Sequence, residues 1–245
     1  MKKDRKRLIA AAMGKIPCDL TVKNVQFVNV FTGEIYPAEV DVIDGWVARV
    51  RYPEEPQELE SKETVDGEGH YLIPGFLDAH VHIESSMMIP EQFGRAVVPW
   101  GTTTVCTDPH EIANVMGKRG VEILCEMTRD LPLHVSIMAP STVPSAPGFE
   151  TAGASLEAED VREMLSYDGV LGLGEVMDFN GVVDSDEKMM AIIDEAQKTG
   201  CLMDAHVPLL KGRSLQAFVS TGLDCDHTYM DVDSVAEKLR CGMWV

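Results

Sequence analysis

The sequence predicts an α/β protein: a (β/α)8 barrel of the TIM type, incomplete here, preceded by part of a small β-sandwich. From residue 71 on, apolar strand-like runs alternate with helical patterns, which is typical of a parallel sheet. Metal-capable side chains follow the ends of these runs, where such barrels assemble their sites. Before residue 70 the pattern is short, β-rich and punctuated by turns. We therefore expect two domains, residues 1–70 and residues 71–245.

Length and composition are those of an ordinary globular protein. The 245 residues can bury a substantial core, and apolar residues make up 45% and charged residues 25%. A formal net charge of −19 repels phosphate backbones, so we expect no nucleic-acid partner. No apolar run approaches the ~18 residues that a membrane span needs. The six scattered cysteines lack a Cys-x-x-Cys pair, which indicates reduced thiols in a cytoplasmic protein.

Residues 1–70 predict a short helix followed by strands. The basic segment from Lys2 to Lys15 has too short an apolar part for a signal peptide, and we expect an amphipathic helix packed on the body. Apolar runs meet across Asp44-Gly45-Trp46, and Asp-Gly between apolar strands is a strong hairpin signal. The segment 52–62, rich in Pro and Glu, indicates a solvated connection before a boundary near residue 70.

Six strand-helix units are expected after this boundary. The strand-like runs end near residues 82, 108, 139, 175, 206 and 227. The helical patterns cover residues 90–99, 113–129, 156–165, 184–199, 212–220 and 231–240. A seventh strand begins at Met243, and because a closed barrel of this type needs eight strands, we expect a truncated chain. The long segment 139–153 is expected to wall or cover the barrel mouth.

The stretch from Pro74 to Ser86 carries the strongest chemical signal. His80 and His82 are separated by one residue, so both imidazoles of an extended strand point to the same side. An isolated His-x-His motif is short enough to occur by chance, and its two histidines would then simply form hydrogen bonds with the backbone. Metal-capable residues recur at corresponding strand ends, and this recurrence favours a metal site. The expected ligands are His80, His82, Glu175, His206 and His227.

The ligand types leave the metal open. Imidazole with carboxylate suits zinc, iron, manganese or cobalt. Glu175 could bridge two ions about 3.5–4 Å apart. His70 and His134 lie outside the matching positions, and we interpret both as structural.

A second polar group follows the second strand of the predicted barrel. Asp108, His110 and Glu111 could add a metal, hold the substrate or cap a helix beginning near Ala113, since acidic residues are favourable at helix N-termini. For Asp108 a site contact and helix capping are equally expected. For the other two a place in the site is favoured.

Several motifs resemble one enzyme family. The segment Pro-Gly-Phe-Leu-Asp-Ala-His-Val-His, beginning at Pro74, resembles the first-strand signature of the amidohydrolase superfamily. The longer segments His-Val-His-Ile-Glu-Ser-Ser-Met from His80, Asp-Pro-His-Glu-Ile-Ala-Asn-Val from Asp108 and Gly-Glu-Val-Met from Gly174 resemble the bacterial and archaeal adenine deaminases. This resemblance spans about residues 19–245.

The resemblance implies a binuclear metal centre, with manganese or iron favoured and zinc as a further option. The implied ligands are the five residues named above, with Glu175 in the place of a carbamylated lysine. The implied reaction is attack of metal-activated hydroxide on C6 of adenine, giving hypoxanthine and ammonia in purine metabolism. We expect the catalytic residues to be Glu84, Glu111 and His227 and the substrate contacts to be Asp108, His110 and Ser85. We also expect the protein to be cytoplasmic, to form a homo-oligomer and to have no membrane partner.

The chain departs from the family pattern at two places. Ala205 and Val207 flank His206 where relatives read Gly-His-Ala-Pro, and Thr228 follows His227 where a glutamate is usual. The family's proton-shuttling aspartate of the eighth strand would lie beyond Val245. Two alternatives therefore stay open: an amidohydrolase acting on another aminopurine or a cyclic amide, and a non-catalytic fragment.

Overall fold

The computed structural model describes residues 4–146 and 148–245, which form two compact units. The first unit is Met1–Pro74 and the second is Gly75–Val245. Lys2 and Lys3 of the expected helix and Pro147 of the expected mouth segment lie outside the described residues.

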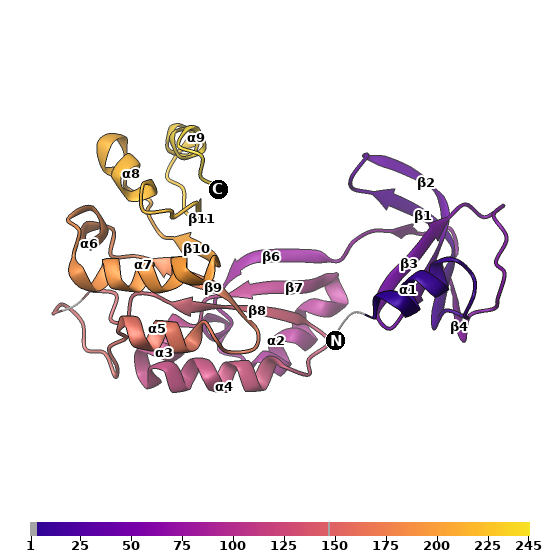
Figure 1. Cartoon of the computed structure of the whole chain (residues 1–245), viewed down its shortest axis with the longest axis horizontal. Coiled ribbons are helices and arrows are strands. Elements are labelled where there is room, and N and C mark those ends of the chain that lie inside the picture. The colour runs from indigo at the N-terminus through magenta and orange to yellow at the C-terminus, as the bar shows by residue number, and fades with distance from the viewer. Residues whose placement is uncertain (1–3, 147) are drawn as a thin grey trace. The chain divides into compact units, whose positions relative to one another are not determined.

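The first unit is a five-stranded sheet with helix α1 (Arg5–Ala12) packed against it (Figure 1). The strands are β1 (Leu20–Asn29), β2 (Glu34–Ile43), β3 (Trp46–Arg51), β4 (Glu63–Asp66) and β5 (Tyr71–Leu72). Their order is β3-β2-β1-β4, and β5 also pairs with β1. Asp4 caps the N-terminus of this helix, and its carboxylate accepts hydrogen bonds from two backbone N–H groups of the first turn. The expected helix is therefore present.

The tight turn between β2 and β3 confirms the predicted hairpin. Ile43 pairs with Trp46, which leaves Asp44 and Gly45 as a two-residue loop. Their φ angles are 50° and 74°, and positive φ at both positions is what this tight hairpin turn requires. The described residues of this unit form one sheet, which fits part of a sandwich.

The second unit is built on six parallel strands (Figure 1). They are β6 (Phe76–Val81), β7 (Thr102–Thr107), β8 (His134–Pro140), β9 (Val170–Val176), β10 (Leu202–Ala205) and β11 (Cys225–Asp226). Their order in the sheet is β11-β10-β9-β8-β7-β6, so each strand pairs with its neighbours in the sequence. This curled half-barrel confirms the predicted incomplete barrel. Beyond it, Trp244 forms only an isolated parallel bridge with Cys225, where a seventh strand was expected.

Helices connect the strands and pack on the sheet. They are α2 (Pro90–Val97), α3 (His110–Met116), α4 (Lys118–Thr128), α5 (Ala158–Met164), α6 (Phe179–Val183), α7 (Glu187–Thr199), α8 (Gly212–Val219) and α9 (Val232–Arg240), with 3-10 turns η1 (Glu84–Ser86) and η2 (Val98–Trp100). The prediction of one helix over 113–129 is wrong. Gly117, with φ 61° and ψ −151°, separates α3 from α4 in a conformation open to glycine.

A single apolar core joins the helices to the sheet. Val121 of α4, Met164 of α5 and Ile192 of α7 are buried against the strands, together with Ile137 and Leu173. In Figure 1, helices α2, α4 and α5 lie along one face of the sheet. Burial of this face holds the strands in register, and the register determines which side chains meet at the strand ends.

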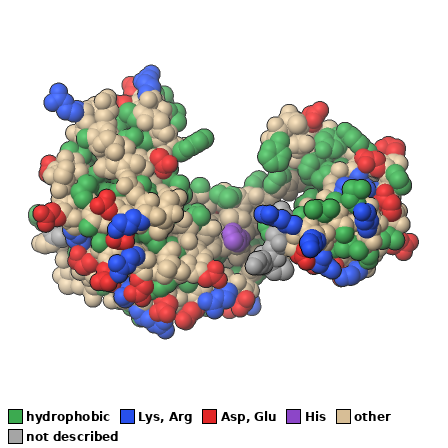
Figure 2. Space-filling model, in the orientation of Figure 1, with side chains coloured by type: hydrophobic (Ala, Val, Ile, Leu, Met, Phe, Trp, Pro, Cys, Tyr) green, Lys and Arg blue, Asp and Glu red, His purple; other side chains and the backbone are tan. Residues whose placement is uncertain are grey.

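The solvent side of helices α4 and α5 carries acidic and basic side chains in close succession (Figure 2). Lys118 Nζ lies 2.6 Å from Glu163 Oε2, and Arg162 Nη2 lies 2.6 Å from Glu159 Oε1. Exposed pairs of this kind contribute little to stability. Among the described helices the longest, α7, has 13 residues, and none combines the length and apolar character of a membrane span.

A glycine substitution in β9 tests the strand register, and a second one in helix α2 serves as its control. A Cβ at Gly172 of β9 would lie 2.1 Å from the backbone oxygen of Leu202, so we expect Gly172→Ala to lower the free energy of unfolding by roughly 1–3 kcal/mol. At Gly94 of α2 the nearest atom, in Leu133, is 3.5 Å away, and Gly94→Ala should stabilise by up to about 1 kcal/mol. Urea unfolding measures both. Equal stability of the two variants would contradict the register of β9 with β10.

Candidate metal centre

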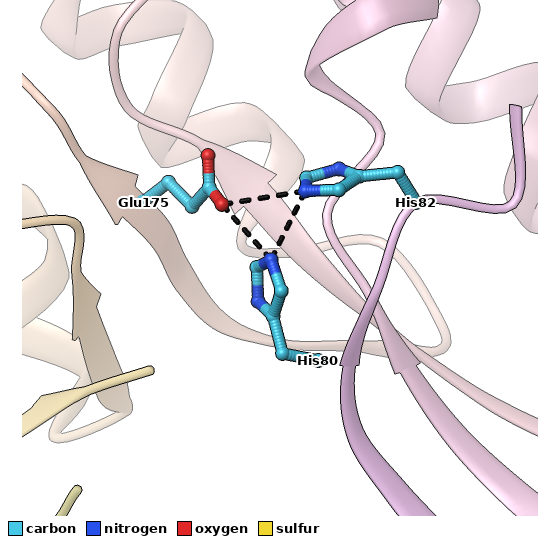
Figure 3. Close-up of side chains that lie close together, drawn as sticks. All are labelled: His80, His82 and Glu175. Carbon is cyan, nitrogen blue, oxygen red and sulfur yellow. Dashed lines mark hydrogen bonds and ion pairs between the residues drawn. The ribbon is translucent and has the colours of Figure 1, made fainter. Parts of the chain in front are cut away.

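The five predicted ligands lie together at the carboxyl ends of the parallel strands. His80 is in β6 and His82 follows it, Glu175 is in β9, and His206 and His227 come directly after β10 and β11. Figure 3 shows the imidazoles of His80 and His82 turned toward the carboxylate of Glu175. Because neighbouring parallel strands end at one edge of the sheet, residues up to 147 positions apart in sequence become neighbours in space.

One carboxylate oxygen lies at the centre of the cluster. The distances from Glu175 Oε1 are 2.9 Å to His80 Nε2, 3.3 Å to His82 Nε2, 3.5 Å to His206 Nδ1 and 3.0 Å to His227 Nε2. Glu175 itself is 2% exposed. A buried carboxylate must be compensated by positive charge or hydrogen bonds, and four imidazoles from three other strands supply that compensation.

The ring nitrogens also approach one another. His80 Nε2 lies 3.0 Å from His82 Nε2, and His206 Nδ1 lies 3.2 Å from His227 Nε2. A neutral imidazole has one nitrogen with a lone pair, and such nitrogens converge when they share a cation. Three three-residue groups have ligand atoms within 4.8 Å of one another and share Glu175: one with His80 and His82, one with His206 and His227, and one with Asp108 and His110. The donor set therefore fits two divalent cations with a shared carboxylate.

The protonation of the cluster reflects its charges. Burial alone would raise the pKa of Glu175, but hydrogen bonds from His110, His206 and His227 among others lower it strongly. Hydrogen bonds to Glu111 and Glu175 raise the pKa of His82 to about 11. The imidazoles of His82 and His227 therefore favour the protonated form, whose charge compensates the carboxylates.

The second predicted group lies against the first. His110 Nδ1 is 3.1 Å from Glu175 Oε2 and 3.5 Å from Asp108 Oδ1. Asp108 is 1% exposed, and its backbone oxygen lies 2.7 Å from His82 Nδ1. Helix α3 begins at His110, and no side chain caps its N-terminus. Capping by Asp108, the alternative suggested by the sequence, is therefore excluded.

Several polar atoms of this group form no well-directed hydrogen bond among the described residues, although some of them lie within ion-pair distance of an imidazole or a carboxylate. They are Glu84 Oε2, both carboxylate oxygens of Asp108, His110 Nδ1 and Glu111 Oε2. The other oxygen of Glu111 accepts a hydrogen bond from Ser85 Oγ at 2.7 Å. Burial raises the pKa of Glu84 and of Asp108. Burial would also raise the pKa of Glu111, but the contact with His82 Nδ1 at 3.4 Å and the hydrogen bond from Ser85 lower it to about 2. A polar ligand bound beside the candidate metal centre would form hydrogen bonds with these buried polar atoms.

Two carboxylates that sequence reasoning left without a role support the histidines. Asp204 Oδ2 lies 2.9 Å from His227 Nδ1. Asp226 forms a fully buried ion pair with Lys238 of α9, and Lys238 Nζ also donates to the backbone oxygen of Thr228 at 2.7 Å. The recurrence of Asp at strand ends was the available signal. The remaining histidines of the chain, His70 and His134, belong to none of the metal-capable groups found among the described residues.

Known proteins resemble this chain in sequence and in fold. The family model described as "Amidohydrolase family" matches residues 71–243. "Adenine deaminase 2" of Carboxydothermus hydrogenoformans is 42% identical over 240 residues, which cover 98% of this chain and 40% of the relative. "Adenine deaminase" of Desulfatibacillum aliphaticivorans is 45% identical over 237 residues, with 97% and 40% covered. The chain thus spans about 40% of the length of these curated relatives.

The fold is shared with a zinc-containing deacylase. N-acyl-D-glutamate deacylase from Bordetella bronchiseptica, solved with zinc and a phosphonate inhibitor, has a TM-score of 0.60 at 14% identity. The structural similarity covers 94% of this chain and 58% of the deacylase, and at this sequence identity it is evidence for the fold alone.

Metal binding should displace protons from the cluster. Hydrogen bonds to carboxylates, outweighing the opposing effect of burial, raise the pKa of His227 to about 9, yet a ligating imidazole must have a free lone pair. We expect the apparent affinity for Zn²⁺ to rise as pH increases between about 6 and 8. Calorimetry in buffers of different ionisation enthalpy should register proton release. Buffer-independent heats would contradict this, and His134→Gln is the matched control that should behave as the parent chain does.

The buried pair behind His227 should matter for stability. Lys238→Met leaves Asp226 buried without its cation, so we expect the free energy of unfolding to fall by about 3–5 kcal/mol. Lys118→Met breaks an exposed pair with Glu163 and should cost no more than about 1 kcal/mol. Urea unfolding compares the two variants. A loss at Lys238 as small as that at Lys118 would show that the pair does not hold the loop of His227.

Proposed function

The chain belongs to the amidohydrolase family, and from this membership we propose that it carries the metal-binding strands of an enzyme that hydrolyses adenine to hypoxanthine and ammonia. The observation that carries the proposal is the two pairs of histidines that share Glu175 in these ligand groups. Relatives named adenine deaminase, 42% and 45% identical over nearly all of the chain, support adenine as the substrate.

The proposed cofactor is a pair of divalent cations, manganese or iron, with zinc as the alternative. His80 and His82 would hold one cation, His206 and His227 the other, and Glu175 would contact both. Two neutral nitrogens and a carboxylate per cation are ligands that suit these metals. When bound, the cations supply Lewis acidity and make hydroxide available from water near neutral pH.

Side chains of the protein must transfer the protons in this reaction. Hydrolysis places a water oxygen on C6 of adenine and releases the amino nitrogen as ammonia, so a ring nitrogen and then the leaving nitrogen must receive a proton. Glu84 and Glu111 are the proposed donors, with Glu84 favoured because Glu111 already accepts a hydrogen bond from Ser85. His227, the third proposed catalytic residue, lies beside the proposed cations, with its Nε2 next to Oε1 of Glu175.

The unpartnered polar atoms support an aminopurine as the ligand. A purine offers ring nitrogens that accept hydrogen bonds and N–H groups that donate them, which matches a surface of carboxylate and imidazole groups. We propose that His110 and Ser85 contact the purine. Asp108 is buried, so its part would be to orient His110 from 3.5 Å away.

The setting proposed for this reaction is the cytoplasm, in purine salvage or catabolism, with the chain part of a homo-oligomer. All six cysteines are free thiols, which suits a reducing compartment. The net charge of −19 makes nucleic acid an unfavourable partner.

Ammonia release tests the proposal directly. The full-length enzyme that contains these strands, loaded with Mn²⁺, should produce ammonia and hypoxanthine from adenine, and Glu175→Gln should lower the rate at least about 100-fold, because the shared carboxylate is lost. The matched control is Glu187→Gln in the first turn of α7, which should leave the rate unchanged. Absence of turnover with both Mn²⁺ and Fe²⁺ would refute the proposal.

A substrate panel separates adenine from the alternatives. Thr228, which stands where the family usually has glutamate, bonds to Asp226 through its hydroxyl at 2.8 Å. Its side chain is thus bonded within the loop of His227, and adenine stays the favoured substrate because of the relatives named adenine deaminase. Hydrolysis of a cyclic amide in place of an aminopurine would favour the alternative activity.

A further inference from the structure

The carboxylate of Asp204 lies behind two of the proposed ligands. It is the last residue but one of strand β10, is 8% exposed, and faces imidazoles that come from β6 and from the loop after β11. Asp204 Oδ2 is 2.9 Å from His227 Nδ1 and 3.6 Å from His80 Nδ1. The first distance is that of a hydrogen bond. The second is too long for one, so Asp204 acts on His80 through its negative charge, which lies opposite Nδ1 and favours a proton there.

Both imidazoles have a carboxylate on each side. The rings of His80 and His227 are stacked, with centroids 3.5 Å apart and planes at 9°. Each turns its Nε2 toward Glu175 Oε1, at 2.9 Å and 3.0 Å, and its Nδ1 toward Asp204. A neutral imidazole has one donor and one acceptor nitrogen, so a proton held on Nδ1 by Asp204 leaves the Nε2 lone pair for a cation.

Asp204 is itself anchored through its other oxygen. Oδ1 accepts a hydrogen bond from the backbone N–H of Ala205 at 3.0 Å and contacts Cys225 Sγ at 3.3 Å. Oδ2 is therefore the oxygen left to the imidazoles. A carboxylate fixed in this way on a strand imposes both the tautomer and the ring orientation of the histidines it faces.

We propose that Asp204 is a positioning residue that sets the tautomer of His80 and His227 and thereby supports both cation sites at once. His80 belongs to the ligand group that contains His82, and His227 belongs to the group that contains His206. One buried carboxylate thus serves the two halves of the centre. The inference rests on the metal centre of the proposed function, and it concerns metal binding, apart from the identity of the substrate.

Metal titration of the variants tests the role. We expect Asp204→Asn, which keeps the shape and removes the charge, to weaken Zn²⁺ binding to the apoprotein about 10–100-fold at both equivalents, measured against a competing chelator. Asp186→Ala, which removes the capping side chain of α7, is the control for a general loss of stability and should bind within about twofold of the parent. Parent-like affinity of Asp204→Asn would overturn the inference. A parent chain that binds no Zn²⁺ would overturn the metal centre as well.

Histidine tautomers in the unaltered chain provide a test that does not depend on how a variant folds. In the Zn²⁺-loaded, ¹⁵N-histidine-labelled protein, the rings of His80 and His227 should have the proton on Nδ1 and the metal on Nε2. If Asp204 were instead a direct ligand in a group with these two histidines, Nδ1 would bind the metal and Nε2 would carry the proton. That pattern in either ring would overturn the positioning role.

Discussion

The carboxylate of Glu175 is buried at the edge of the sheet where the strands end, and its charge has to be compensated there. Removing a carboxylate from water costs several kcal/mol unless charges or hydrogen bonds replace the solvent. Four imidazoles from three other strands replace it, and His110 reaches its second oxygen. Each of these side chains has its position because the strand that carries it is locked in register by the core below. The fold and the candidate centre are thus mutually dependent.

Close approach of backbone to side chains makes this packing possible. A Cβ at Gly174 would lie 2.1 Å from Asp108 Oδ2, so glycine leaves the space in which the buried carboxylate sits beside β9. The backbone oxygen of Asp108 then meets His82 Nδ1 at 2.7 Å. A small residue on one strand therefore contributes to the orientation of an imidazole on another, without touching it.

Support for the ligands is distributed over the neighbouring strands. Two histidines of the centre meet a backbone or carboxylate oxygen through their Nδ1 atoms: that of Asp108 for His82, and that of Asp204 for His227. Lys238 of α9, fully buried, holds Asp226 and the carbonyl of Thr228 on either side of His227. Such outer contacts reduce the freedom of a ligand before a cation arrives, which lowers the entropic cost of binding.

Much of the architecture could be predicted from periodicity and turn chemistry. The alternation of strands and helices, the Asp44-Gly45 hairpin and the recurrence of His and Glu at strand ends are local patterns, and parallel topology alone implies that strand ends converge. The single helix over 113–129 was wrong because its apolar spacing continues across Gly117, whose φ of 61° depends on the chain around it.

The sequence by itself determined the ligand types and their place at strand ends, because those follow from residue identity and the two-residue period of a strand. Only the tertiary structure decided which atoms face each other. It put Asp204 behind His80 and His227, left the N-terminus of α3 without a side-chain cap, and paired Asp226 with Lys238. Contacts between strands depend on register and side-chain orientation, and these are properties of the packed core that no local stretch of sequence contains.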